Sequence, residues 1–271
     1  MALRKIDSFI IKIISTKGYS TNMEDHVYRR TDEIMSGFSN SDPGHQMDHI
    51  DAVLNHLNQA LKCNTTFDLT EEQIRALRYA VMMHDVDDHK LTDTHDTLAN
   101  AYGVLAEVGE DHNNTELVLQ MIRLVSCSSN GNNNSMCVEH KNWWLLWPRI
   151  VDRLEAIGNI GIWRAWVYAV KKGNPMHTLS TPLPKTEEEL KEIISAERFA
   201  RYSGSSDSLI DHFYDKLLYI ANLDSPEVQS NAYLLQIAKE RHQIMVDFVL
   251  DYSNSEDKDK IIKEYIGHLI K

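Results

Sequence analysis

The sequence has little of what disulfide-bonded or turn-rich proteins need. Its 271 residues include only 3 cysteines, 11 glycines and 6 prolines. Glycine and proline together reach about half of their average usage, so turns are few and long helices are expected. Cys63, Cys127 and Cys137 show no CxxC spacing, which argues against a cysteine zinc site and for a reducing compartment. We therefore expect a cytoplasmic protein.

Positive charge and long apolar runs are also scarce. The 28 Lys and Arg residues stand against 40 Asp and Glu residues, for a formal net charge of −12. This balance argues against a protein that binds duplex nucleic acid, because such a protein needs a basic stripe on its surface. The apolar run that begins at Phe9 is broken by Lys12, so it predicts neither a membrane span nor a signal peptide.

Apolar residues recur at helical spacing along most of the chain, and no alternating pattern typical of a strand stands out. Thr70 and Gln73 form a capping box that opens one helix, and Asn114 is expected to cap another. Thr186 is expected to cap a helix that runs through Arg201. The predicted apolar stripes are 3–14, 50–61, 74–81, 117–125, 150–161, 209–220 and 234–249. The predicted fold class is all-α.

A weak boundary lies near residues 173–184, where the Gly173-Asn174-Pro175 break separates a histidine-rich part from a histidine-poorer tail. We expect residues 1–172 to form a core with N-terminal helices and a flexible loop near 128–142, in which the asparagine-rich stretch lies. Residues 173–271 are expected to form a C-terminal helical extension packed on this core.

Histidine is concentrated in one quarter of the chain, where 7 of the 13 histidines lie between residues 45 and 112. His45 and His49 are four residues apart, so a helix would present both on one face. The apolar helix of residues 74–83 ends abruptly in His84-Asp85. An imidazole and carboxylates at the end of a buried run are costly unless a cation is present, and a divalent metal suits both ligand types.

A third element with an inward-facing acid follows the tryptophan cluster. Asp152 stands between Val151 and Leu154, so its carboxylate is expected to face the core. The histidines and acids could instead be structural, as satisfied core side chains and helix caps. The order His49, His84-Asp85, Asp152 favours a metal site over that alternative.

This order resembles the H…HD…D arrangement of the HD-superfamily metal-dependent phosphohydrolases. Residues 44–50, GHQMDHI, are similar to the GHDxxHV opening of a bacterial subgroup that includes nucleotide pyrophosphohydrolases. Residues 151–162, VDRLEAIGNIGI, resemble that subgroup's ADRLDAIGAIGIAR, and residues 210–218, IDHFYDKLL, resemble its INHFYEKLL. The matches cover roughly residues 44–250.

The resemblance implies an HD-domain helical bundle that hydrolyses a nucleotide or small phosphate ester, with nucleoside triphosphates cleaved to a monophosphate and pyrophosphate. It implies one divalent ion (Mn, Ni, Mg, Zn or Fe), and its expected ligands are His49, His84, Asp85 and Asp152. Asp88 would handle the proton of the attacking water and Lys90 would hold phosphate. The residues expected to contact the substrate are His45, Arg153 and Lys216. The expected partner is this small phosphate substrate, and a homodimer is left open.

Several alternatives remain open from the sequence. Residues 87–90 could be a solvated charged turn, and Arg153 could form ion pairs instead of binding phosphate. Ile150 and Glu155, where the subgroup usually has an acid and an aspartate, favour a second function, a nucleotide-sensing or scaffold module without turnover. A di-iron oxygenase on the same fold would need further histidine ligands.

Overall fold

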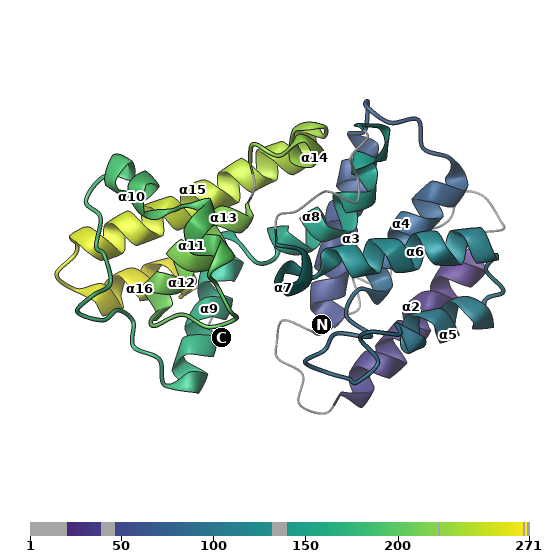
Figure 1. The fold of residues 1–271 in the computed structure, drawn as a ribbon, viewed down its shortest axis with the longest axis horizontal. Helices are drawn as coiled ribbons and strands as arrows, with labels where there is room; N and C mark the ends of the chain where they lie inside the picture. The colour runs from purple at the N-terminus through teal and green to yellow at the C-terminus, as the bar shows by residue number, and fades with distance from the viewer. Residues whose placement is uncertain (1–20, 39–46, 132–139, 222, 268, 270–271) are drawn as a thin grey trace, which may run out of the picture.

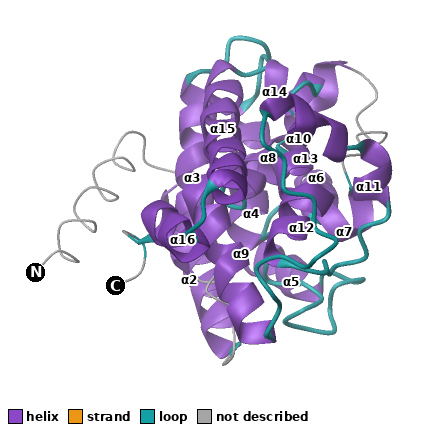
Figure 2. Cartoon of the chain, turned by 90° about the vertical axis from the view of Figure 1, so that its left-hand side faces the viewer, coloured by secondary structure: helices purple, strands orange, loops and turns teal. Residues whose placement is uncertain are grey.

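The chain folds into two groups of helices that lie side by side (Figure 1). The computed structural model describes residues 21–38, 47–131, 140–221, 223–267 and 269. No strand occurs among these described residues (Figure 2), which confirms the all-α prediction. The helix predicted within residues 3–14 and His45 lie outside them.

The first group carries the expected site. Its helices are α2 (Thr21–Gly37), α3 (Met47–Lys62), α4 (Glu71–Met83), α5 (Ala99–Glu107), α6 (His112–Val125), α7 (Cys127–Asn130), the 3-10 helix η3 (His140–Leu146) and α8 (Trp147–Leu154). Helices α3, α4, α6 and α8 pack on one another. Ile50, Leu57 and Leu77 are fully buried there, so the apolar stripes predicted for 50–61 and 74–81 form the core.

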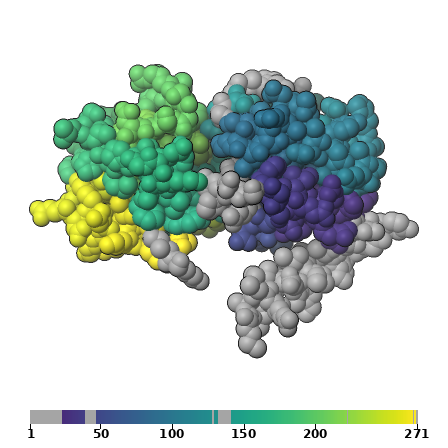
Figure 3. Space-filling view, turned by 90° about the horizontal axis from the view of Figure 1, so that it is seen from below, coloured from purple at the N-terminus to yellow at the C-terminus, as the bar shows by residue number. Residues whose placement is uncertain are grey.

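The second group begins at α9 and contains one long helix. Its elements are α9 (Gly158–Lys172), α10 (Glu187–Ile193), α11 (Ala196–Ala200), α12 (Leu209–His212), the π-helical turn η4 (Phe213–Leu217), α13 (Leu218–Ile220), α14 (Pro226–Gln229), α15 (Ala232–Asn254) and α16 (Lys258–Ile266). Helix α9 packs on α15 and α16, and the two groups abut in the space-filling view (Figure 3). Division into a core and an extension stays a prediction.

Local hydrogen bonds decide where the helices begin. The capping box is confirmed, because the Thr70 hydroxyl accepts a bond from the Gln73 amide at 3.2 Å and the Gln73 side chain accepts one from the Thr70 amide at 2.9 Å. The prediction that Asn114 caps α6 is wrong. Asp111 is in extended backbone and caps this helix, and the Asn114 amide donates to its carboxylate at 3.1 Å.

Three predicted continuous helices are interrupted. The stripe of 150–161 is split, because α8 ends at Leu154 and α9 begins at Gly158, whose φ of +72° turns the chain between the two helices. The helix predicted from Thr186 through Arg201 ends at Ile193, and the Ser195 hydroxyl then caps α11. The stripe of 209–220 is likewise divided by the π-helical turn η4.

The turn between α8 and α9 requires glycine for two separate reasons. A Cβ on Gly158 would lie 3.0 Å from the Arg241 Cγ atom of α15, in addition to the strain of its positive φ. Gly161, three residues later, approaches the Ala156 backbone so closely that a Cβ would lie 2.3 Å from its carbonyl oxygen. The glycines of the AIGNIG segment therefore serve the close packing of this turn.

Gly158→Ala should lower the free energy of unfolding by about 2–4 kcal/mol, because it adds backbone strain and a contact with Arg241. Gly173→Ala is the matched control, since Gly173 has a φ of +71° but no atom within 4 Å of the added Cβ. This control substitution should lower the free energy of unfolding by only about 1 kcal/mol, because it adds backbone strain without a new contact. Urea unfolding of both variants measures the difference, and equal losses would contradict the packing argument.

Candidate metal centre

The HD pair lies at the buried end of α4. The helix is apolar and buried from Ala76 through Met83, apart from Arg78, and His84 is its C-cap residue. His84 and Asp85 are only 7% and 6% exposed. An ionised carboxylate in such a place needs a compensating positive charge or several hydrogen-bond donors.

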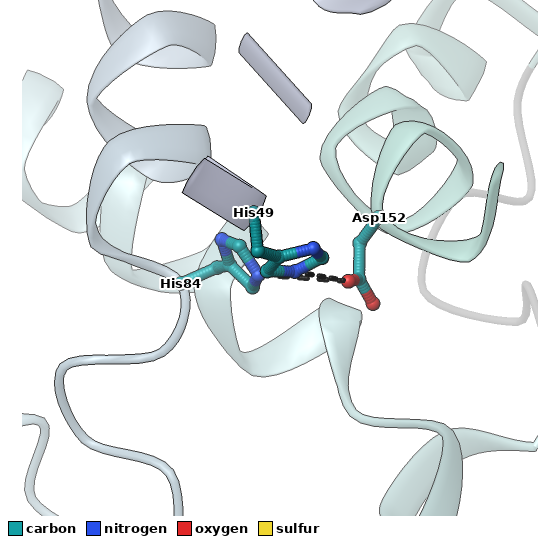
Figure 4. A group of neighbouring side chains, drawn as sticks. All are labelled: His49, His84 and Asp152. Carbon is teal, nitrogen blue, oxygen red and sulfur yellow. Dashed lines mark ion pairs between the residues drawn. The ribbon is translucent and has the colours of Figure 1, made fainter. Parts of the chain in front are cut away.

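Helices α3 and α8 bring the other two predicted ligands to the same point (Figure 4). His49 belongs to the first turn of α3 and Asp152 to the last turn of α8. The Nε2 atom of His49 lies 3.1 Å from Asp152 Oδ1, and that of His84 lies 3.6 Å from the same oxygen. Asp85 Oδ2 lies 3.4 Å from His84 Nε2 and 3.9 Å from His49 Nε2.

These separations fit the ligands of one metal ion. With ligand bonds of about 2.1 Å, neighbouring ligand atoms are about 3.0 Å apart at right angles and about 3.4 Å apart at tetrahedral angles. The four measured separations span 3.1–3.9 Å. His49, His84 and Asp152 thus place their donor atoms within the mutual reach that one metal ion requires, and Asp85 lies beside them.

His84 is held in the tautomer that binds a metal. Its Nδ1–H donates to the Val81 carbonyl oxygen at 2.8 Å, which leaves the lone pair on Nε2. The Nε2 atom is buried and has no hydrogen-bond partner among the described residues. Because buried polar atoms are almost always satisfied, a nitrogen in this position is suited to bind a cation.

The electrostatics of the cluster also favour a cation. Burial alone would lower the pKa of the His84 imidazole, but the carboxylates of Asp85 and Asp152 raise it to about 10. Burial would raise the pKa of Asp152, but the adjacent imidazoles of His49 and His84 hold it well below its ordinary value. The cluster therefore attracts positive charge, and a divalent ion fits the donor set.

A second contact joins α3 and α8 beside the ligands. His56 lies two turns beyond His49 on α3, and its Nε2 atom is 2.9 Å from Glu155 Oε1, three residues beyond Asp152. Arg241 of α15 donates to the Glu155 carboxylate at 2.8 Å and to the Leu154 carbonyl oxygen. The sequence analysis missed this contact, although its signal was present as the seven-residue and three-residue spacings on the two helices.

The acids after the HD pair have different roles. Asp87 is 1% exposed, and its carboxylate accepts bonds from the Asn100 and Ala101 amides at 3.1 and 2.9 Å, which anchors the start of α5. Asp88 is more exposed, and its Oδ1 accepts a bond from the Lys90 amide at 2.8 Å. Its other oxygen has no described hydrogen bond, so only Asp88 is available to a ligand.

The predicted substrate-binding residues lie in different environments. Arg153 is 4% exposed and donates to the Gly131 carbonyl oxygen next to α7, which makes it part of the wall beside Asp152. Burial lowers the pKa of the Lys216 amine, and the charges of Lys90 and Asp152 act on it in opposite directions. The roles of Arg153, Lys216 and Lys90 stay predictions, as does that of His45.

The remaining histidines of the rich segment do not extend the metal cluster. The rings of His89 and His95 lie 5.5 Å apart. Within the described ranges, the group of three or more residues with donor atoms in metal-binding reach consists of His49, His84 and Asp152, with Asp85 beside them.

No helix in the described part of the chain is long and apolar enough to cross a membrane.

Comparison with solved structures identifies the class of fold. An HD-superfamily hydrolase from Bacillus thuringiensis matches 90% of this chain and 98% of its own, with a TM-score of 0.54 and 19% identity. The structure of Bacillus subtilis YpgQ in complex with ADP matches 88% of this chain and 98% of its own, with a TM-score of 0.56 and 19% identity. The chain therefore has the HD-superfamily fold, as its motifs predicted.

A sequence relative then defines the family. Protein L803 of Acanthamoeba polyphaga mimivirus is 36% identical over 225 residues, which cover 77% of this chain and 88% of L803. YpgQ of Bacillus subtilis is 26% identical over 173 residues, which cover 63% and 67% of the two chains. No protein-family model matches the chain. The chain belongs to the same family as L803, on the HD-superfamily fold.

Glu155→Gln tests the second contact through its pH dependence. Burial raises the pKa of Glu155, but His56 and Arg241 outweigh it and lower the pKa to about 2, from an ordinary value of 4.5. Ionised Glu155 therefore stabilises the fold above pH 4.5, and this contribution is lost as the pH falls toward 2. We expect the variant to be about 1–3 kcal/mol less stable at pH 7.

The deficit should shrink when urea unfolding is measured at pH 3.5 instead of pH 7. Glu256→Gln, at an exposed position, should leave stability unchanged and serves as the control. A deficit that stays constant over this range would mean that the charge of Glu155 contributes nothing.

Proposed function

We propose that the protein is a metal-dependent phosphohydrolase that cleaves a nucleoside triphosphate to a monophosphate and pyrophosphate. The observation that carries the proposal is the convergence of His49, His84, Asp85 and Asp152, whose donor atoms lie 3.1–3.9 Å apart in the measured pairs. The ADP in the YpgQ structure supports a nucleotide as the ligand. A nucleotide-sensing module without turnover would keep the same ligands, so hydrolysis must be measured directly.

The four ligand residues would hold one divalent ion, whose identity (Mn, Ni, Mg, Zn or Fe) their chemistry leaves open. Such an ion polarises a phosphoryl oxygen and makes a water molecule more acidic, from a pKa of about 15.7 toward about 7. The protein contributes the rigidity of the site. His49 and Asp152 come from separate helices, and Val81 orients the His84 ring.

Asp88 is the proposed general base. It follows the ligand Asp85 by three residues in a tight turn, in which the Asp88 amide donates to the Asp85 carbonyl oxygen at 3.1 Å. The bond from the Lys90 amide orients one carboxylate oxygen, which leaves the other to accept the proton of the attacking water. Asp87 cannot replace it, because its carboxylate is occupied at the start of α5.

Basic side chains would stabilise the charge that develops on the phosphoryl oxygens. Lys90 is exposed on the turn after Asp88, and Lys216 approaches it from the second group of helices. Arg153 lies beside Asp152, and His45 precedes His49 by four residues in the sequence. These four residues are the proposed phosphate contacts in a protein whose overall charge would repel the substrate.

Asp85→Ala should abolish both stoichiometric metal binding and hydrolysis, because it removes a carboxylate that contacts both imidazoles. The measurements are metal content by elemental analysis and pyrophosphate release from a panel of nucleoside triphosphates. Asp93→Ala, which removes an exposed acid from the same loop, should change neither. An Asp85→Ala protein that keeps full metal content and activity would refute the assignment of the site.

Asp88→Asn should keep the metal and the fold but lower turnover by about a hundredfold or more, because the amide cannot accept a proton. Asp87→Asn is the informative comparison, since it should weaken the start of α5 and lower thermal stability. Turnover and metal content are measured on the same preparations. Near-normal turnover of Asp88→Asn would remove it from the mechanism, and loss of metal would make it a ligand.

A further inference from the structure

Two pairs of ionisable side chains connect α3 with the end of α8, and one of them takes no part in the proposed chemistry. The first pair consists of the proposed ligands His49 and Asp152, which lie 3.1 Å apart (Figure 4). The second pair consists of His56 and Glu155, at 2.9 Å. His56 follows His49 by seven residues, so both point from the same face of α3, about 10 Å apart along its axis. The second pair therefore lies on the same seam between the helices.

The backbone links Glu155 directly to the ligand Asp152. Helix α8 ends at Leu154, and in the turn that follows, the Glu155 amide donates to the Asp152 carbonyl oxygen at 3.0 Å. The next amide, that of Ala156, donates to the Arg153 carbonyl oxygen at 3.0 Å. Such bonds between residues three apart tighten the last turn of a helix. A displacement of Glu155 therefore also moves the backbone of Asp152.

Two arginines of the second group of helices hold the same turn from outside. Arg241 of α15 donates to the Leu154 carbonyl oxygen and, at 2.8 Å, to the Glu155 carboxylate. Arg164 of α9 donates to the Glu155 carbonyl oxygen at 3.0 Å. The last carbonyl oxygens of a helix have no partner within the helix, and cationic donors are favoured there. The end of α8 is thus fixed at its backbone as well as at the Glu155 side chain.

His56 has partners at both ring nitrogens, although it is buried and outside the proposed chemistry. Its Nδ1 atom lies 2.7 Å from the Tyr233 hydroxyl, and its Nε2 atom lies 3.2 Å from the Arg241 guanidinium as well as next to Glu155. Tyr233 and Arg241 both belong to α15. A polar network with all its members paired is rigid. The His56 ring therefore holds Glu155 at a fixed distance from α3.

We propose that Glu155 is a positioning residue for the metal ligand Asp152. His56 and Arg241 hold Glu155 in place, so its contacts set the separation of α3 and α8 and, with it, the spacing between the donor atoms of His49 and Asp152. Residues that orient metal ligands without touching the ion typically change metal affinity by about 10–100-fold. The inference rests on the proposed metal site, and it makes the affinity for the ion depend on the second group of helices.

Calorimetric titration of the metal-free protein with Mn²⁺ and, separately, with Zn²⁺ measures the affinity of the site. Glu155→Gln keeps the shape of the side chain but removes its charge, and it should weaken binding by about tenfold. His56→Leu and Arg241→Met should each weaken binding to a similar extent. Combining Glu155→Gln with His56→Leu should add less than about twofold to either single effect, because both changes remove the same contact.

Glu110→Gln is the matched control. The nearly buried Glu110 carboxylate also pairs with an arginine, Arg75, at 3.0 Å, but this pair lies at the end of α4 opposite His84. The control variant should lose stability and change metal affinity by less than about twofold. Affinity is measured where every variant is folded, so a loss of stability alone leaves it unchanged. Glu155→Gln is nearly isosteric and remains informative if His56→Leu fails to fold.

Reciprocity between the contact and the ion supplies a second measurement. If the Glu155 contact strengthens metal binding by about tenfold, a bound ion strengthens that contact by the same factor, about 1.4 kcal/mol. The loss of unfolding free energy in Glu155→Gln should therefore be greater by this amount in saturating Mn²⁺ than in the metal-free protein. In Glu110→Gln the loss should be the same in both conditions.

Unchanged metal affinity in Glu155→Gln and Arg241→Met would overturn the positioning role, as would equal weakening by Glu110→Gln. Either result would leave the proposed hydrolysis standing. Weakened metal binding in the variants of a protein that hydrolyses no nucleotide would support the positioning role and refute the phosphohydrolase. A wild-type protein that binds neither ion would refute both.

Discussion

The arrangement of the site depends on two carboxylates that the fold places against two buried imidazoles. Asp85 is nearly buried at the end of α4, and Asp152 faces both His49 and His84 from α8. Without a cation among these groups, the buried His84 Nε2 atom has no hydrogen-bond partner among the described residues. The helices α3, α4 and α8 therefore converge on a point where their polar ends could hold an ion.

The second group of helices is coupled to this point through Glu155. Asp152 and Glu155 lie one turn apart, so the contacts that orient the α8 terminus also orient the ligand. Arg241 holds Glu155 and the Leu154 carbonyl oxygen, and Tyr233 reaches His56 Nδ1 at 2.7 Å. Helix α15 thus packs against both α3 and α8 beside this contact. The C-terminal helices therefore support α3 and the end of α8, which carry proposed ligands.

The sequence predicted the helical class from spacing along the chain, and its motif order predicted that His49, His84 and Asp152 would lie together, as they do. The breaks at Gly158 and Ser195 and the π-turn were missed, because contacts with distant residues decide them. Gly158 packs against Arg241, and Arg198 binds Asp211 of α12 and Asp215 of η4. The sequence did not distinguish the environments of Asp87 and Asp88 either. Only the fold shows that one anchors α5 while the other keeps an oxygen available.

Whether a charged side chain is already paired within the fold also explains how an acidic protein could favour an anionic ligand. A net charge of −12 acts at long range and is screened by salt, whereas charges within a few ångströms of a bound phosphate are screened far less. Asp85 and Asp152 are proposed metal ligands, and Glu155 is already paired with Arg241. Lys90 and Lys216 have no such acidic partner in the described part of the chain. Local pairing, and not total charge, therefore sets the sign of the field at this site.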